Sequence, residues 1–185
     1  MVKNLAKRAM TAEAEKACYV IDHLVEALGN DPSSSLRRAS IIIDIDQYPG
    51  TTQAGVMERL GIDKSTANRE AEWLFNYGCI RRSEARSDGR AVSLEVYGYA
   101  KTAMESALEH FKGDHAAMKT FIDRMVKYLK MERPTLRDAK IVFALYQRGK
   151  ATKNEILNSL YDGPTSTDNR AYNQLVEEGV IGSAV

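Results

Sequence analysis

Residues 51–90 constrain the fold of this chain more than any other stretch of its sequence. Thr51 and Thr52 can cap a short helix over 53–60, in which apolar residues recur at helical spacing. Gly61 then allows a sharp turn, and a second helix is expected over 64–77. Two helices joined by so short a turn are typical of a helix-turn-helix, whose second helix lies in a DNA major groove.

The expected second helix has one apolar face and several polar ones. Asp63 is suited to cap its first turn, and Gly78 is suited to end it. Ala67, Ala71 and Leu74 fall at i, i+4 and i+7, so we expect them to pack inward. The residues expected on the other faces are Lys64, Ser65, Asn68, Arg69 and Glu72.

Two short strands, 79–82 and 91–94, are expected after this helix and form an antiparallel ribbon. The loop between them contains Asp88-Gly89, a pair that marks a tight turn. Residues 79–90 hold four arginines against Glu84 and Asp88, whereas residues 33–97 as a whole hold nine Lys/Arg and nine Asp/Glu. The ribbon is therefore locally basic in a region of zero net charge, and DNA responds to the local field.

These motifs follow the order of a winged helix-turn-helix, and as a set they resemble the MarR family of transcription regulators (multiple-antibiotic-resistance regulators). Residues 60–66 match the family's Leu-Gly-hydrophobic-Asp-Lys-Ser-Thr opening. The positions that follow are matched by Leu74, Gly78, Arg81-Arg82, Asp88-Gly89-Arg90 and Leu94. The resemblance covers residues 10–131 and implies a winged helix that binds double-stranded DNA.

The sequence departs from the family pattern directly after the ribbon. The family usually has Leu-Thr, two residues and Gly at this point, whereas residues 94–98 read Leu-Glu-Val-Tyr-Gly. The missing Thr leaves the cap of the next helix unassigned.

The resemblance and the outward positions together indicate which side chains contact DNA. Arginine and lysine suit guanine edges and phosphates, and asparagine suits adenine. The candidate contacts are Thr52, Lys64, Ser65, Thr66, Asn68, Arg69, Arg82, Arg86 and Arg90. Two alternatives to DNA contact stay open. The helix residues would then form a solvated face, and Arg90 would pair with Asp88 and brace the loop.

Further helices are expected over 11–29, 36–47, 99–111 and 115–130. Thr11 and Gly29 are suited to bound the first of them. Its apolar stripe consists of Ala14, Ala17, Cys18, Ile21, Leu24, Val25 and Leu28. In MarR-like proteins the first helix and the last two interlock across a two-fold axis, so the resemblance implies a homodimer. The stripes alone are equally consistent with the core of a monomer.

The chain also contains an internal repeat, in which residues 36–80 recur as 136–181. Leu36-Arg37-Arg38-Ala39-Ser40-Ile41 aligns with Leu136-Arg137-Asp138-Ala139-Lys140-Ile141, and Ser65-Thr66-Ala67-Asn68-Arg69 aligns with Ser166-Thr167-Asp168-Asn169-Arg170. The repeat favours a helix over 36–47, although Ile41-Ile42-Ile43 has strand propensity. It divides the chain into 1–133, a MarR-like winged-helix DNA-binding and dimerisation domain, and 134–185, a second helix-turn-helix.

The second copy lacks the ribbon, and residues 134–185 hold six Lys/Arg and six Asp/Glu. The missing ribbon and the lack of net positive charge both remove contacts to phosphate. We therefore expect this copy to pack against the main body or a partner rather than read DNA. Its Asn169 and Arg170 keep DNA contact open as an alternative.

The composition argues against several other classes of protein. The 185 residues carry a net charge of +1 and no apolar run long enough to span a bilayer. His23, His110 and His115 are scattered, so we expect no metal, no cofactor and no catalysis. Two cysteines, Cys18 and Cys79, fit the reducing cytoplasm. Peroxide-sensing relatives of the MarR family place a reactive cysteine on the first helix, but Cys18 lies on the apolar stripe and is equally a core residue.

The sequence thus predicts a mainly α protein with a small antiparallel β-ribbon: a winged helix-turn-helix, helical dimerisation arms and a second, wingless helix-turn-helix. The predicted function is that of a cytoplasmic transcriptional regulator that binds double-stranded DNA as a homodimer. The alternatives are a plasmid or phage replication or partition protein, and a winged-helix module that binds another protein. A small-molecule effector between the dimer helices, among Met and Tyr side chains, is a further open alternative.

Overall fold

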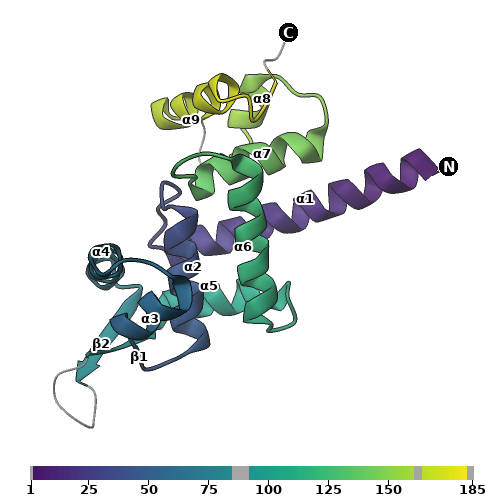
Figure 1. Cartoon of the computed structure of the whole chain (residues 1–185). Coiled ribbons are helices and arrows are strands. Elements are labelled where there is room, and N and C mark those ends of the chain that lie inside the picture. Colours follow the sequence, from purple (N-terminus) through teal and green to yellow (C-terminus); the bar gives the residue numbers. More distant parts are fainter. Residues whose placement is uncertain (1, 85–91, 161–163, 183–185) are drawn as a thin grey trace.

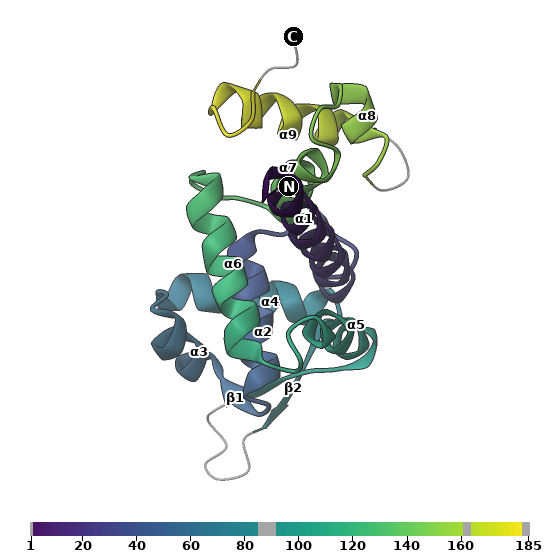
Figure 2. The same ribbon diagram turned by 90° about the vertical axis from the view of Figure 1, so that its right-hand side faces the viewer.

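The computed structural model describes residues 2–84, 92–160 and 164–182, and the side chains of 12–83, 92–160 and 164–182. Its elements are α1 (Val2–Ala27), α2 (Leu36–Gln47), β1 (Thr51–Thr52), α3 (Gln53–Leu60), α4 (Lys64–Asn76), β2 (Ile80–Glu84), β3 (Val92–Val96), α5 (Gly98–Glu109), α6 (His115–Leu129), α7 (Leu136–Arg148), α8 (Lys153–Leu157) and α9 (Ser166–Glu177). The described chain is mainly helical with a small three-stranded antiparallel sheet, which is compatible with a winged-helix-like fold. The sheet lies at one end of the molecule and α7 to α9 at the other (Figures 1 and 2).

The sheet has one more strand than the sequence predicted. Its order is β1-β3-β2, and Thr51 and Thr52 pair with Leu94 and Ser93 of β3. Thr52 also caps α3, because its side-chain oxygen accepts a hydrogen bond from the Gly55 N–H at 3.2 Å. A cap residue has an extended backbone, so the same residue can end a strand and begin a helix. The predicted loop motif at 88–90 lies outside the described residues.

Helix α1 is longer than predicted and is buried on more than one side. The expected start at Thr11 was wrong, because residues 2–10 contain neither Gly nor Pro and continue the helix. Its N-terminal half projects from the body of the protein (Figure 1). Val20 and Ala27 are buried together with the predicted stripe, because α1 packs against both α5 and α7.

Helix α2 forms the centre of the fold and has the predicted bounds. Ser35 caps it by accepting the Arg38 N–H at 3.2 Å, and Ile41, Ile42 and Ile43 are buried within it. Two carboxylates on this helix, those of Asp44 and Asp46, are also buried, which the sequence did not reveal. Side chains from neighbouring helices partner them: the cation Arg59 lies 2.7 Å from Asp44, the cation Lys101 lies 2.7 Å from Asp46, and a His115 ring nitrogen lies 2.9 Å from the other Asp46 oxygen.

The helix-turn-helix formed by α3 and α4 has nearly the predicted bounds. Gly61 takes a left-handed backbone conformation with φ of 62°, which a residue with a side chain adopts less readily. Ala67, Ala71 and Leu74 of α4 are buried, as predicted. Further along, Tyr97 precedes α5 and makes no side-chain cap hydrogen bond. Glu95, which stands where the family pattern has Thr, lies in β3 and is not the cap of this helix.

The second copy of the repeat comprises α7, α8 and α9, and it packs against the main body through α7. The Lys140 Nζ of α7 donates to the Cys18 carbonyl of α1 at 3.3 Å and pairs with the Asp22 carboxylate. The expectation that this copy packs on the main body is therefore confirmed for α7. No strand follows α9 within residues 164–182. None of the helices in the described ranges has both the length and the apolar composition needed to cross a membrane.

Candidate nucleic-acid interface

The outward face of α4 carries most of the predicted DNA contacts. Lys64, Ser65, Asn68 and Arg69 are all exposed on it. The helix begins at Asp63, whose carboxylate accepts the Ser65 hydroxyl at 2.6 Å and the Thr66 N–H at 2.9 Å. These hydrogen bonds hold the pKa of the Asp63 carboxyl well below its usual range, so the cap stays ionised. The first turn of α4 is thereby held in place next to the exposed face.

Thr66 does not belong to this face, which weighs against its predicted contact with DNA, and that contact stays a prediction. Its relative exposure is only 6%, and its hydroxyl donates to the second Asp63 oxygen at 2.7 Å. Thr66 shares its side of the helix with the buried Glu70, one turn further on. The motif that suggested the contact is thus a cap motif at this position. Thr52, another predicted contact, is half-buried and already caps α3.

The two arginines of β2 point to opposite faces of the sheet, as strand geometry requires. Arg82 faces α4, where its guanidinium lies 2.8 Å from the Glu72 carboxylate and 4.6 Å from the centre of the Phe75 ring. Its Nε and Nη2 are buried with no acceptor among the described residues. Arg81 turns away to Glu95 at 2.7 Å. Arg82 is therefore held against α4, while Arg86 and Arg90 lie outside the described residues.

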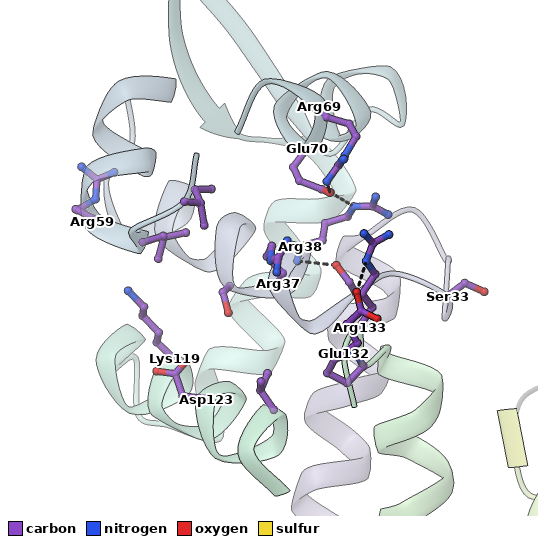
Figure 3. A pocket seen from close by; sticks show the side chains of 16 residues that line it. Ser33, Arg37, Arg38, Arg59, Arg69, Glu70, Lys119, Asp123, Glu132 and Arg133 are labelled. Carbon is purple, nitrogen blue, oxygen red and sulfur yellow. Dashed lines mark hydrogen bonds and ion pairs between the residues drawn. The ribbon is translucent and has the colours of Figure 1, made fainter. Parts of the chain in front are cut away.

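A groove of about 720 Å³ adjoins α4, and we call it the basic groove (Figure 3). It is formed by the start of α2, the turn between α3 and α4, one face of α6 and the segment before α7. Its charged lining residues are the six cations Arg37, Arg38, Arg59, Arg69, Lys119 and Arg133 and the three carboxylates Glu70, Asp123 and Glu132. Residues so far apart in the chain give no local sequence signal, so the sequence did not predict this groove.

Ion pairs fix some of these cations and leave others available. The Arg38 Nε lies 2.7 Å from Glu70, and its guanidinium stacks 3.7 Å from the centre of the Trp73 ring. Arg59 is bound to Asp44, a hydrogen bond that raises the pKa of its guanidinium. Among the described residues, no carboxylate lies within ion-pair distance of Arg37 or Lys119. The basic groove therefore offers positive charge beside α4 to an anionic ligand.

The apolar stripes that suggested a dimer are used inside one chain. The predicted stripe residues of α1 are buried, as are Ala103 and Met104 of α5 and Met118 and Ile122 of α6. Helices α1 and α6 pack on α7 and α2 of the same chain. Of the two alternatives left by the sequence, the structure therefore shows these stripes in the core of the chain.

The two cysteines lie in the same core. Burial raises the pKa of the Cys18 thiol to about 11, more than the neighbouring Lys140 lowers it, and burial also raises that of Cys79 to about 11. A protonated, buried thiol is a poor nucleophile, which favours packing over peroxide sensing for Cys18. Within the ranges that the structure describes, no group of three His, Cys, Asp or Glu side chains is placed to hold a metal ion.

Comparison with known proteins adds no relative to these observations. No protein-family model, no curated protein and no solved structure matches the chain.

Proposed function

We propose that this protein binds double-stranded DNA through α4 and the basic groove, and that it acts as a sequence-specific transcription regulator of the winged helix-turn-helix type. One observation carries the proposal above the others. Arg69 lies on the exposed face of α4, with 65% of its side chain accessible, and it also lines the basic groove. A helix that reads bases and a surface that binds phosphates therefore meet at one residue.

The proposed division of work follows from the chemistry of the side chains. Asn68 and Arg69 present the amide and the guanidinium that suit adenine and guanine edges in a major groove. Arg37 and Lys119 in the basic groove would neutralise phosphates, which supplies affinity without sequence choice. The motifs in α3, α4 and the ribbon of β2 and β3 follow an order that resembles the MarR family. This resemblance supports the proposal that these elements bind DNA.

The proposal is tested by comparing Arg69→Ala with Arg81→Ala. The two side chains are 65% and 60% exposed, and each substitution removes one positive charge, but Arg81 lies on the face of the sheet turned away from α4. A preferred duplex is first selected from a random library. Affinity is then measured on that duplex and on a random one over a range of salt concentrations.

We expect Arg69→Ala to weaken binding to the selected duplex by about 1–3 kcal/mol, because a base-edge contact carries discrimination. Binding to random duplex should change less, and Arg81→Ala should change neither. An equal loss on both duplexes would make Arg69 a phosphate contact. A protein that selects no duplex, or an Arg69→Ala variant without effect on any, would refute the proposal.

The homodimer expected from the sequence stays a prediction, and sedimentation of the protein alone and on its DNA tests it. Most residues of the stripes expected to hold a dimer are buried in one chain, whereas Val126 of α6 is 37% exposed. Binding to iterated direct repeats near an origin of replication would favour the replication or partition alternative. Absence of salt-dependent DNA binding would favour the protein-interaction module.

A further inference from the structure

The two copies of the repeat meet at a local two-fold axis. The Leu36 N–H at the start of α2 donates to the Pro134 carbonyl at 2.9 Å, and the Leu136 N–H at the start of α7 donates to the Ser34 carbonyl at 2.9 Å. Between these bonds, Ser35 and Thr135 form an antiparallel bridge. Reciprocal bonds of this kind relate the two strands by a two-fold rotation. The first helices of the two copies therefore start from symmetric positions.

The helices that precede the two copies are exchanged about this axis. Helix α1 leads into α2 but packs against α7, while α6 leads into α7 but packs against α2. Each copy is thus covered by the helix that belongs to the other, which is the arrangement of a swapped dimer within a single chain. Helices α4 and α9 lie on the side of the molecule opposite the projecting half of α1 (Figure 1).

Three exposed residues of α4 recur at the corresponding positions of α9. Ser65, Asn68 and Arg69 correspond to Ser166, Asn169 and Arg170; the serines and arginines are exposed, and Asn169 is half-buried. Two buried positions differ, because Ala67 and Ala71 of α4 are replaced in α9 by Asp168 and Tyr172, which are 2% and 4% exposed. A third is unchanged: Leu74 and Leu175 are both fully buried.

Packing alone does not explain why these three exposed residues recur. Substitutions at exposed positions are usually close to neutral for stability, so packing gives no reason to keep those side chains. A common ligand for the two outward faces does give such a reason.

We propose that α9 is a second DNA-reading helix, so that one chain reads two inverted half-sites of similar sequence, one with α4 and one with α9. This inference rests on the proposed function, and it replaces the expectation that the second copy does not read DNA. No strand follows α9 within residues 164–182, but base contacts do not require a ribbon, because phosphate contacts position a protein on DNA while base contacts carry the sequence choice. Glu177 and Glu178 follow the far end of α9, whereas a recognition helix reads bases with its N-terminal residues.

The test uses the full chain, because α7 is part of the core and a truncated chain would lose it. Duplexes are selected from a random library with the unaltered protein and with Arg69→Ala, Arg170→Ala and Arg81→Ala. The number of chains per duplex is measured by sedimentation. Circular dichroism checks that each variant stays folded, which we expect because all three arginines are exposed.

We expect the unaltered chain to select an inverted pair of similar half-sites and to bind as one chain per duplex. Arg69→Ala should relax base preference in one half-site and Arg170→Ala in the other, each with a loss of roughly 5- to 150-fold in affinity. Arg81→Ala should keep both preferences.

Three results would overturn the inference while leaving the proposed function standing. In the first, Arg170→Ala leaves the base preference in both half-sites unchanged. In the second, Arg170→Ala lowers affinity equally on all duplexes. In the third, two chains bind each duplex and Arg69→Ala relaxes the base preference in both half-sites. If Arg69→Ala also leaves affinity and base preference unchanged, or if no duplex is selected, the proposed function fails together with the inference.

Discussion

Replacing Glu70 with Gln should lower the stability of this protein and raise its affinity for DNA. The Glu70 side chain lies on the buried side of α4 and is 7% exposed, and its carboxylate accepts the Arg38 Nε at 2.7 Å. Gln has nearly the same shape and can still accept this hydrogen bond, so the substitution removes the charge and retains the contact. The Arg38 guanidinium remains stacked on Trp73 in the basic groove, without its main counter-charge.

The size of the loss in stability follows mainly from the bond to Arg38, because the second partner of Glu70, the exposed Arg69, lies at the longer distance of 3.5 Å. A hydrogen bond to a charged group contributes about 1.5–3 kcal/mol, and one between neutral groups about 0.5–1.5 kcal/mol. We therefore expect Glu70→Gln to lower the free energy of unfolding by about 1–1.5 kcal/mol, which a domain of ordinary stability tolerates. Urea denaturation followed by circular dichroism measures this loss.

The gain in affinity has an electrostatic cause. The basic groove loses one of its three carboxylates, and Arg38 becomes available to a phosphate. One additional phosphate contact would steepen the slope of log affinity against log salt by about 0.9 and raise affinity up to about tenfold at 0.1 M salt.

The matched control is Glu95→Gln, which removes the charge from a pair of the same 2.7 Å length with Arg81 on the other face of the sheet. Because the Glu95 side chain is 43% exposed, we expect a loss in stability below about 1 kcal/mol and no change in DNA binding. A Glu70→Gln variant that is less stable but binds DNA more tightly would show an electrostatic role of the basic groove, because general loss of structure would lower both stability and affinity. If Glu70→Gln lowers both stability and affinity, or leaves the salt slope unchanged, the assignment of phosphate binding to the groove is wrong.

Two further predictions concern the core. Ile141 is fully buried in α7, so Ile141→Ala should lower the free energy of unfolding by about 2–5 kcal/mol; urea denaturation that shows a loss within 0.5 kcal/mol would mean that the second copy is not part of the cooperative core. Because burial raises the pKa of Cys18 to about 11, its thiol should react slowly with iodoacetamide at neutral pH and faster as the pH approaches that value. The folded state holds this proton more tightly than the unfolded one, so the contribution of Cys18 to stability should fall as the pH rises above about 9. Rapid alkylation at pH 7, read by mass spectrometry, would contradict the burial argument.

The features that the sequence alone determined are those built from neighbouring residues. The bounds of α2 and α3, the cap at Asp63 and the left-handed turn at Gly61 all depend on contacts within a few positions. Hydrophobic spacing likewise identified which residues of α4 face inward. Such features are readable because their energy comes from local hydrogen bonds and from the periodicity of the helix.

Tertiary structure decided what those elements contact. The pairing of β1 with β3, the pairs that compensate Asp44 and Asp46, and the burial of Thr66 depend on segments that only the fold brings together. The basic groove joins residues from Ser33 to Pro134. An apolar stripe specifies that a face must be covered but does not name its partner, because the hydrophobic effect is non-directional. For this reason the sequence could not distinguish a dimer arm from a core helix. The structure shows which helices cover the stripes within one chain, because α1 packs against α7 and α6 packs against α2.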